Sequence, residues 1–245
     1  MKLCMFSPKG AELERGWPGR IDGDRIVQLA AQTLQAFFTG GGTAREHAEY
    51  ALAECDLRAP VLTPPAVRVF RPFGPGATTL FSFRSPFPVL GPEEALTAPE
   101  GTDELSYGLG IAAVIGADGA VAGYTVANDW TACDLARAER AAGFGPSKSC
   151  DFGLSLGPVL VTPDELSGSS GRLVGRVNGI EQSAVDLTGL SYPWPELAAH
   201  AARNTTLRPG DLLIASAGTG TSALAPGDVV ELECEGIGLL RNPVA

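Results

Sequence analysis

The sequence predicts an α+β fold rich in strands, with short helices and a closed or rolled sheet. Three observations predict this class. Apolar stretches of strand length recur along the second half of the chain, separated by residues that favour turns. The 245 residues include 31 glycines and 19 prolines, which implies many turns between short elements. Hydrophobic residues make up 44% of the chain and charged residues 19%, so there is enough apolar material for a core.

Residues 1–57 are expected to form a small N-terminal α/β domain, and residues 58–245 a second, larger domain. In the first domain we expect strands at residues 2–6 and 25–29. Thr43-Ala44-Arg45-Glu46 has the capping-box pattern, which predicts a helix from there to residue 54. After residue 57 the chain is rich in proline, glycine and phenylalanine, and is expected to be irregular as far as residue 99.

The larger domain is expected to alternate strands with short helices. The turn Ala117-Asp118-Gly119 joins the two longest predicted strands into a hairpin. Strands are expected at residues 105–115, 121–128, 159–161, 172–178, 211–215 and 229–235. Helices are expected at residues 131–142, 162–165 and 195–204.

The composition limits the partners. A net charge of −10 and a pI of about 4.7 leave nothing to neutralise a phosphate backbone, so no nucleic-acid partner is expected. No apolar run approaches the ~18 residues of a membrane span, and no signal-peptide core precedes Ser7. The five cysteines are scattered and form no CxxC pair, which suits a reducing cytoplasm and excludes a cysteine-built zinc site. We therefore expect a cytoplasmic protein with a small-molecule substrate.

Several motifs of the chain occur together in the order of one known family. They are GYTVANDWTA from Gly123, KS from Lys148, LGPVLVTPDEL from Leu156, RPGDL from Arg208 and PGDVVELECEGIG from Pro226. On these motifs, residues 60–245 resemble the fumarylacetoacetate hydrolase family, and the preceding residues look like the small leading domain of many members. The resemblance implies a mixed β-roll, a homodimer, and Mg²⁺ or a similar ion held by carboxylates. It also implies C–C hydrolysis, decarboxylation, isomerisation or hydration of β-diketo or 2-oxo acids.

Most of the family's metal ligands are absent from this chain. The two glutamates of its Glu-x-Glu strand align with Gly108 and Gly110, and an earlier aspartate aligns with Val69. Only Asp129 remains of the four carboxylates. One carboxylate cannot replace the several oxygen ligands that a hard divalent ion needs. We therefore expect no bound metal and no other cofactor.

The same alignment gives the residues expected to bind the substrate. Cys133 and Ala136 replace an arginine and a glutamine of the family, Ala217 falls near its late threonine, and Arg84 stands in for a basic residue. Because these changes remove charge and mostly volume, we expect a larger and more apolar pocket that suits a bulky ligand. The expected substrate-binding residues are Arg84, Val69, Phe73, Gly108, Gly110, Cys133, Ala136 and Ala217.

Lys148 and Asp129 are the catalytic candidates. Lys148 is one of three lysines, and a buried ammonium beside Asp129 suits an acid/base pair. A structural ion pair, or an exposed lysine, explains Lys148 equally well. Asp129 precedes a predicted helix and serves equally well as its N-cap. Gly218-Thr219-Gly220-Thr221 suits either an oxyanion-binding loop or a plain reshaped turn.

Three hypotheses of function follow. The first is a metal-independent enzyme that isomerises, cyclises or cleaves a bulky, enolisable carbonyl compound of a biosynthetic pathway by acid/base catalysis. The second is a metal-dependent hydrolase or decarboxylase of a β-diketo or 2-oxo acid. Its ligands would be acids outside the alignment: Glu93, Glu94, Asp103 or Glu104. The third is a binding homologue without catalysis. Residues 71–99 align poorly, so a catalytic residue from that region is left open.

Overall fold

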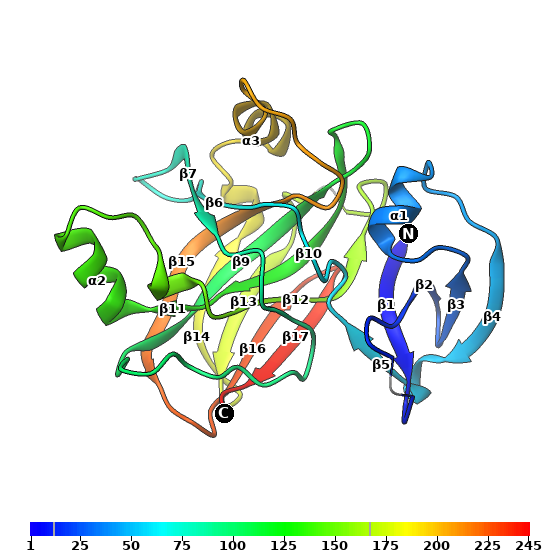
Figure 1. Cartoon of the computed structure of the whole chain (residues 1–245), viewed down its shortest axis with the longest axis horizontal. Helices are drawn as coiled ribbons and strands as arrows, with labels where there is room; N and C mark the ends of the chain where they lie inside the picture. The colour runs from blue at the N-terminus through cyan, green and yellow to red at the C-terminus, as the bar shows by residue number, and fades with distance from the viewer. Residues whose placement is uncertain (12, 167) are drawn as a thin grey trace.

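One large mixed sheet carries most of the chain. The computed structural model describes residues 1–11, 13–166 and 168–245. Within these ranges the main sheet has 13 strands in the order β4-β3-β2-β1-β12-β10-β9-β15-β6-β7, with β5, β8 and β11 paired at its side. A second sheet has the order β14-β13-β16-β17 (Figure 1). The fold is α+β and mostly sheet, which confirms the predicted class.

The strands are β1 (Lys2–Pro8), β2 (Trp17–Asp22), β3 (Arg25–Leu29), β4 (Glu46–Ala51), β5 (Cys55–Arg58), β6 (Val67–Arg71), β7 (Thr78–Arg84), β8 (Val89–Leu90), β9 (Leu105–Ile115), β10 (Val121–Asp129), β11 (Thr131–Ala132), β12 (Leu154–Val161), β13 (Arg172–Val177), β14 (Ile180–Asp186), β15 (Leu212–Leu224), β16 (Val229–Cys234) and β17 (Gly238–Pro243). The helices are α1 (Leu34–Thr39), α2 (Cys133–Ala141) and α3 (Trp194–Ala201), with 3₁₀ turns η1 (Leu52–Glu54), η2 (Lys148–Cys150) and η3 (Leu187–Gly189). None of the helices in the described part of the chain has the length and apolar character of a membrane span.

Strand β9 lies at the centre of the molecule. It pairs antiparallel with β10 on one side and with β15 on the other, and β6 continues the sheet parallel to β15. Every residue of β9 is buried. A strand covered on both faces has a nearly continuous apolar sequence, which explains why residues 105–115 could be predicted from hydrophobicity alone.

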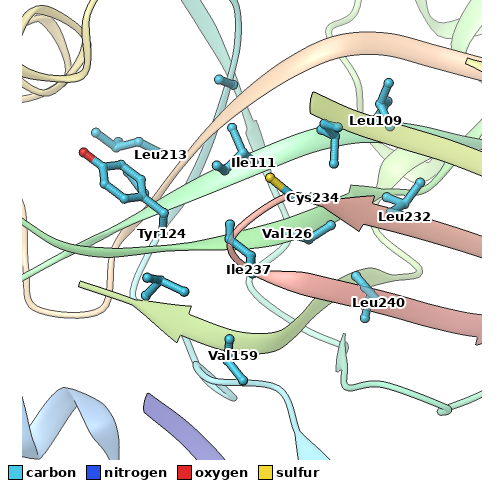
Figure 2. Packing of buried hydrophobic residues seen from close by; sticks show 14 of the residues in the cluster. Leu109, Ile111, Tyr124, Val126, Val159, Leu213, Leu232, Cys234, Ile237 and Leu240 are labelled. Carbon is cyan, nitrogen blue, oxygen red and sulfur yellow. The ribbon is translucent and has the colours of Figure 1, made fainter. Parts of the chain in front are cut away.

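The core lies between the two sheets. Figure 2 shows side chains of β16 and β17 facing those of β9, β10 and β12. Leu232 and Cys234 are buried while Glu233 between them is exposed, so β16 turns its apolar side to the main sheet. The side chains labelled in this cluster are Leu109, Ile111, Tyr124, Val126, Val159, Leu213, Leu232, Cys234, Ile237 and Leu240.

The N-terminal strands extend the same sheet. Leu3 in β1 pairs with Leu160 in β12, and β2, β3 and β4 follow in order beyond β1 (Figure 1, blue). The division of the chain into residues 1–57 and 58–245 stays a prediction.

The helix predicted from Thr43 to residue 54 is wrong. The chain there forms strand β4, followed by the turn η1. Strand β4 pairs with β3, and the Tyr50 ring lies 5.3 Å from the ring of Phe6 and 5.9 Å from that of Trp17. These tertiary contacts outweigh the local capping signal.

Other predicted elements differ less. Residues 57–99 were expected to be irregular but contain β6, β7 and β8, and residues 162–165 form a turn instead of a helix. Strands β2, β5, β11, β14 and β17 and helix α1 were not predicted either. Of the other predicted elements, the strands at residues 25–29 and 105–115 have the predicted bounds, and the rest are present with shifted ends.

Replacement of Ile111 tests the position of the core. Ile111→Ala is expected to lower the free energy of unfolding by about 2–5 kcal/mol, because the side chain is fully buried. The matched control is Ile180→Ala on β14, where the side chain is 66% exposed and the change is expected to stay within about 0.5 kcal/mol. Chemical denaturation measures both. Equal losses of unfolding free energy in the two variants would contradict the placement of Ile111 in the core.

Candidate functional site

A small pocket opens where one end of the central strands meets α2 and η2. It is lined by Val69, Arg71, Arg84, Gly108, Asp129, Thr131, Ala136, Arg140, Pro146, Cys150, Ser216, Gly218 and Thr219. Its cavity volume is about 30 Å³, room for about one water molecule. The lining comes from β6, β7, β9, β10, β11, α2 and β15, so segments far apart in sequence build the site together.

A buried ion pair forms the floor of this pocket. Arg84, the last residue of β7, donates from Nε to Asp129 Oδ1 at 2.7 Å and from Nη2 to Asp129 Oδ2 at 2.8 Å. The two side chains are 6% and 8% exposed. Ser82 Oγ accepts a further hydrogen bond from Arg84 Nη1 at 2.7 Å. The guanidinium is therefore fixed by contacts on two sides, and bidentate pairs of this kind are geometrically specific.

The ion pair determines the charge state of Arg84. Burial alone would lower the pKa of the guanidinium, but the charge and hydrogen bonds of Asp129 outweigh this effect, and the pKa is raised. Arg84 is a permanent cation in this pocket.

Asp129 is held by its neighbours on β9 and β10. Asn128 Oδ1 accepts a hydrogen bond from the backbone N–H of Gly108 at 2.9 Å, which ties the end of β10 to β9. Asp129 is not the N-cap of α2: that position is Ala132, and no side chain caps the helix there. The carboxylate is thus free of a capping role and bonded to Arg84 instead.

The glycines on β9 leave no space for larger residues. A Cβ on Gly108 would lie 2.6 Å from the backbone oxygen of Asp129 and 3.0 Å from its Cβ. At Gly110 a Cβ would lie 3.1 Å from the backbone oxygen of Ala127. The strands pack closely because these side chains are missing, so glycine is part of the packing at both positions.

The residues of this site do not fit a divalent metal ion. Gly108, Gly110 and Val69 supply no side-chain oxygen, and both oxygens of Asp129 already accept hydrogen bonds from Arg84. Among the residues that the structure describes, no group of three or more His, Cys, Asp or Glu side chains is placed to hold an ion. A hard cation needs several oxygen ligands together.

The acids considered as substitute ligands lie outside the pocket. Glu93 pairs with Arg241, Glu94 with Arg58, and Glu104 with Arg137. Asp103 also lies outside the pocket lining. These carboxylates therefore bring no ligand to Asp129.

The wall of the pocket is cationic. Arg71 at the end of β6 and Arg140 on α2 both line it, both are exposed, and no acid within the described ranges forms an ion pair with either. With Arg84, the lining has three arginines and a single acid, Asp129. The expectation of a large apolar pocket is therefore wrong. It counted only the charges lost at the compared site positions, and Arg71 and Arg140 were not among these positions.

Cys150 brings a thiol to the same pocket. Its Sγ lies 3.6 Å from Thr131 Oγ1 and 3.6 Å from Ser149 Oγ. Burial raises the pKa of the Cys150 thiol, and the opposing effect of Arg84 does not cancel it. The group therefore stays protonated at neutral pH and is a weak hydrogen-bond donor.

The structure brings half of the predicted site residues together. Those that line the pocket are Asp129, Arg84, Val69, Gly108 and Ala136. Those that do not are Lys148, Phe73, Gly110, Cys133 and Ala217.

Lys148 is the main correction. Its side chain is 66% exposed, and its Nζ lies 3.1 Å from Asp151 Oδ1, so the expected buried pair with Asp129 is absent. Lys148 and Asp151 lie three positions apart at the 3₁₀ turn η2, and this local ion pair directs the Lys148 ammonium toward solvent. Arg84 takes the place beside Asp129 that was expected for Lys148.

The other predicted residues that do not line the pocket lie in different surroundings. Phe73 forms an isolated bridge with Leu190, and Gly110 is enclosed by β10 and β15. Cys133 Sγ lies 4.0 Å from the backbone oxygen of Thr131, and Ala217 is exposed.

Several lining residues were not predicted. They are Arg71, Thr131, Arg140, Pro146 and Ser216. Gly218 and Thr219 belong to the glycine-rich segment that was noted as a possible oxyanion-binding loop, and both line the pocket. The side chain of Thr221 in that segment lies outside the described part. For Arg71 the sequence offered no signal, since its region was expected to be irregular. For Arg140 the only signal was its place on the helix predicted to follow Asp129.

Comparison with known proteins places this site in a family. The sequence profile of the fumarylacetoacetate (FAA) hydrolase C-terminal domain matches residues 71–245. The chain belongs to this family. The match includes the pocket residues from Arg71 onward, among them Arg84, Gly108 and Asp129.

Two relatives illustrate the similarity in amino-acid sequence. A protein of Methanocaldococcus jannaschii is 32% identical over 162 residues, which are 62% of this chain and 67% of that protein. The mitochondrial oxaloacetate tautomerase fahd2 of Xenopus laevis is 30% identical over 174 residues, 64% of this chain and 54% of the tautomerase. The matched region thus spans about half the length of the tautomerase.

Solved structures show the same fold over the whole chain. A 2-hydroxyhepta-2,4-diene-1,7-dioate isomerase from Mycobacterium marinum superimposes with a TM-score of 0.83 at 23% identity, covering 100% of this chain and 98% of the isomerase. A maleylpyruvate hydrolase from Sphingobium, in complex with manganese and pyruvate, gives 0.76 at 19% identity, with 100% and 99% covered. The named relatives and neighbours are tautomerases, isomerases and hydrolases, which supports an enzymatic role in general terms.

Replacement of Gly108 tests the close contact behind Asp129. Gly108→Ala is expected to lower the free energy of unfolding by about 1–3 kcal/mol, because the new methyl group would overlap the Asp129 backbone. Gly76→Ala is the control, since a Cβ there meets no atom within 4 Å. Thermal melting compares the two variants. A Gly108→Ala protein as stable as the control would show that β9 and β10 are not packed this closely.

Proposed function

We propose that this protein is a metal-independent enzyme that enolises a small carbonyl compound carrying a carboxylate. The observation that supports it is the cationic pocket built around the buried Arg84–Asp129 pair. Such a pocket attracts an anion and holds a carboxylate base next to it. The reaction would be a tautomerisation or isomerisation, or a C–C cleavage that begins from the same enolate.

The proposed substrate is small and anionic, in place of the bulky one expected from sequence. A cavity of about 30 Å³ is too small for a bulky ligand, so we propose that a small substrate enters it only in part, with its carboxylate at the exposed arginines Arg71 and Arg140. Arg71 and Arg140 have no acidic partner within the described residues, so they are available for a substrate carboxylate. Arginine binds carboxylates through paired hydrogen bonds, which also orients them.

The proposed base is Asp129. Removal of a proton next to a carbonyl group requires a base held in place without a large reorganisation, and Arg84 fixes both carboxylate oxygens. Each oxygen keeps lone pairs beyond those used by Arg84, so one of them can accept a proton from carbon. Lys148, the acid of the initial hypothesis, is not part of this proposal because it faces solvent.

Metal independence rests on the donor set. Asp129 and Arg84 satisfy each other, and Gly108, Gly110 and Val69 offer no further oxygen ligands. The oxaloacetate tautomerases among the relatives suggest keto–enol interconversion of a 2-oxo acid as a first reaction to examine. We also retain the homodimer, the cytoplasmic location and a role in biosynthesis as predictions.

The decisive experiment follows proton exchange at carbon. Pyruvate in D₂O is incubated with the protein in buffer containing a chelator, and the loss of its methyl protons is recorded by proton NMR. Oxaloacetate tautomerisation is followed in parallel by its enol absorbance. We expect exchange or tautomerisation above the uncatalysed rate and unchanged by the chelator. Activity that requires added Mg²⁺ or Mn²⁺ would favour the metal-dependent hydrolase. Saturable binding without exchange would favour a binding homologue.

Arg140 tests the proposed binding of the carboxylate. Arg140→Ala is expected to raise KM about tenfold with a smaller effect on kcat, because a charged hydrogen bond to substrate is lost. Arg137→Ala on the same helix is the matched control, since Arg137 pairs with Glu104 away from the pocket. Steady-state kinetics of both variants give the comparison. A KM equal to that of the control would exclude Arg140 from substrate binding.

Asp129 and Lys148 test which residue is catalytic. Asp129→Asn is expected to lower kcat at least about 100-fold, because the amide cannot accept the proton. Lys148→Ala is expected to keep the wild-type rate, since its ammonium pairs with Asp151 in solvent. The proton-exchange rates of the two variants show which residue is catalytic. Thermal melting checks that both variants are folded. A large loss in Lys148→Ala would restore the initial acid/base pair.

A further inference from the structure

We propose that the guanidinium of Arg84 is the cation of this site that stabilises the negative charge of the enolate as Asp129 takes the proton. This inference rests on the proposed function. It assigns to one side chain the stabilisation of charge that metal-binding members of the family are expected to obtain from an ion.

The hydrogen bonds of Arg84 leave one donor for a ligand. A guanidinium has five N–H groups. Nε and Nη2 each donate one hydrogen bond to Asp129, and Nη1 donates to Ser82 Oγ at 2.7 Å and to the backbone oxygen of Phe83 at 3.2 Å. Among the described residues, the second N–H of Nη2 has no acceptor. Because Arg84 lines the cavity, this N–H is available to an oxygen atom bound there.

Arg84 lies in a part of the pocket where Asp129 is its only acidic neighbour. Asp129 is the only acid in the pocket lining, and it is paired with one of the three arginines there, Arg84. The backbones of Gly108 and Asp129 approach so closely that an acidic side chain at position 108 has no space. The pocket therefore has one acid and one buried cation in contact, and this pair is electrically balanced without any ion.

Proton transfer would move charge within this balanced arrangement. The C–H bond next to the carbonyl group breaks, its proton goes to an Asp129 oxygen, and its electron pair forms the carbon–carbon double bond. The π electrons of the carbonyl group move to the carbonyl oxygen, which becomes the enolate. One negative charge thus leaves Asp129 and appears on the enolate oxygen. Delivery of the Asp129 proton to the enolate oxygen gives the enol and completes the tautomerisation. Return to carbon restores the keto form, and if the proton has first exchanged with solvent deuterium, this return is the exchange that proton NMR measures.

Arg84 is in contact with the charge at both stages. Before the transfer it is paired with the Asp129 carboxylate. Afterwards Asp129 is neutral, and the remaining Nη2 N–H is the donor that we assign to the enolate oxygen. Both side chains are more than nine-tenths buried, so charge interactions in this pocket are weakly screened by water. A fixed donor that meets charge as it develops is an effective form of catalysis. The ion pair therefore has a chemical role in addition to a structural one.

Arg84→Met with added guanidinium tests this proposal. The variant keeps an unbranched side chain but has no cation. We expect pyruvate exchange to fall at least about 100-fold. Millimolar guanidinium chloride, below denaturing concentrations, is expected to restore it about tenfold or more, whereas equal concentrations of sodium or magnesium chloride are not. Arg137→Ala with guanidinium is the matched control and is expected to show no gain.

Binding of oxalate gives a readout that does not need turnover. Oxalate is a stable planar analogue of the pyruvate enolate. We expect calorimetry to show binding to the wild type, at least about tenfold weaker binding to Arg84→Met, and recovery with guanidinium. If Arg84→Met does not fold, Arg84→Lys is used, which keeps the charge but not the bidentate pair and is expected to retain part of the exchange.

The outcomes separate the two proposals. A wild-type protein that binds oxalate through Arg84 but exchanges no proton would overturn the proposed enolisation and leave Arg84 as an anion-binding cation. A folded Arg84→Met protein that keeps the wild-type exchange rate would overturn the role of Arg84 and leave the proposed function in place. Absence of rescue by guanidinium in a folded, inactive variant, or rescue by magnesium, would also overturn it.

Discussion

The bidentate ion pair between Arg84 and Asp129 connects two strands whose residues are 45 positions apart in sequence. Neither side chain could be buried alone, because an unpaired charge in a protein interior is costly. Arg84 therefore requires Asp129, and Asp129 requires Arg84. The glycines of β9 are part of the same arrangement, since they let β9 and β10 approach closely at this end of the sheet. The surroundings of the pocket are built around this one contact.

Much of the fold could be predicted from the sequence, and the reasons are local. Strand β9 is buried on both faces, so hydrophobicity alone located it. Strand β4 could not be found in this way, because its six residues are mostly exposed and its Tyr50 is held by rings from distant strands. Strands β6, β7 and β8 lie in a proline-rich region whose composition resembles a loop. Strand β6 pairs with β15 and β8 pairs with β12, both far away in sequence, and β7 pairs with β6.

The candidate site was predicted in part. Asp129, Gly108 and Val69 were found because their segments align with strands of the family. The position of a residue within a strand then fixes where it lies in the sheet. Lys148 was misplaced because it lies at a 3₁₀ turn, where the nearby Asp151 decides the direction of its side chain. Arg71 and Arg140 carry no motif of their own. They become part of the pocket only through the packing of β6 and α2 around it.

The pairing of β1 with β12 has a consequence for solubility. Without the first strands of the chain, one side of β12 would present unpaired backbone groups, and an open apolar edge invites pairing with other molecules. The N-terminal strands move that edge outward to β4. There the exposed side chains include Glu46 and Glu49, which form ion pairs with Arg20 and Arg25 at the surface. Charged edges of this kind discourage pairing between molecules, so the first segment of the chain replaces an apolar strand end at Leu160 and Val161 with a charged edge.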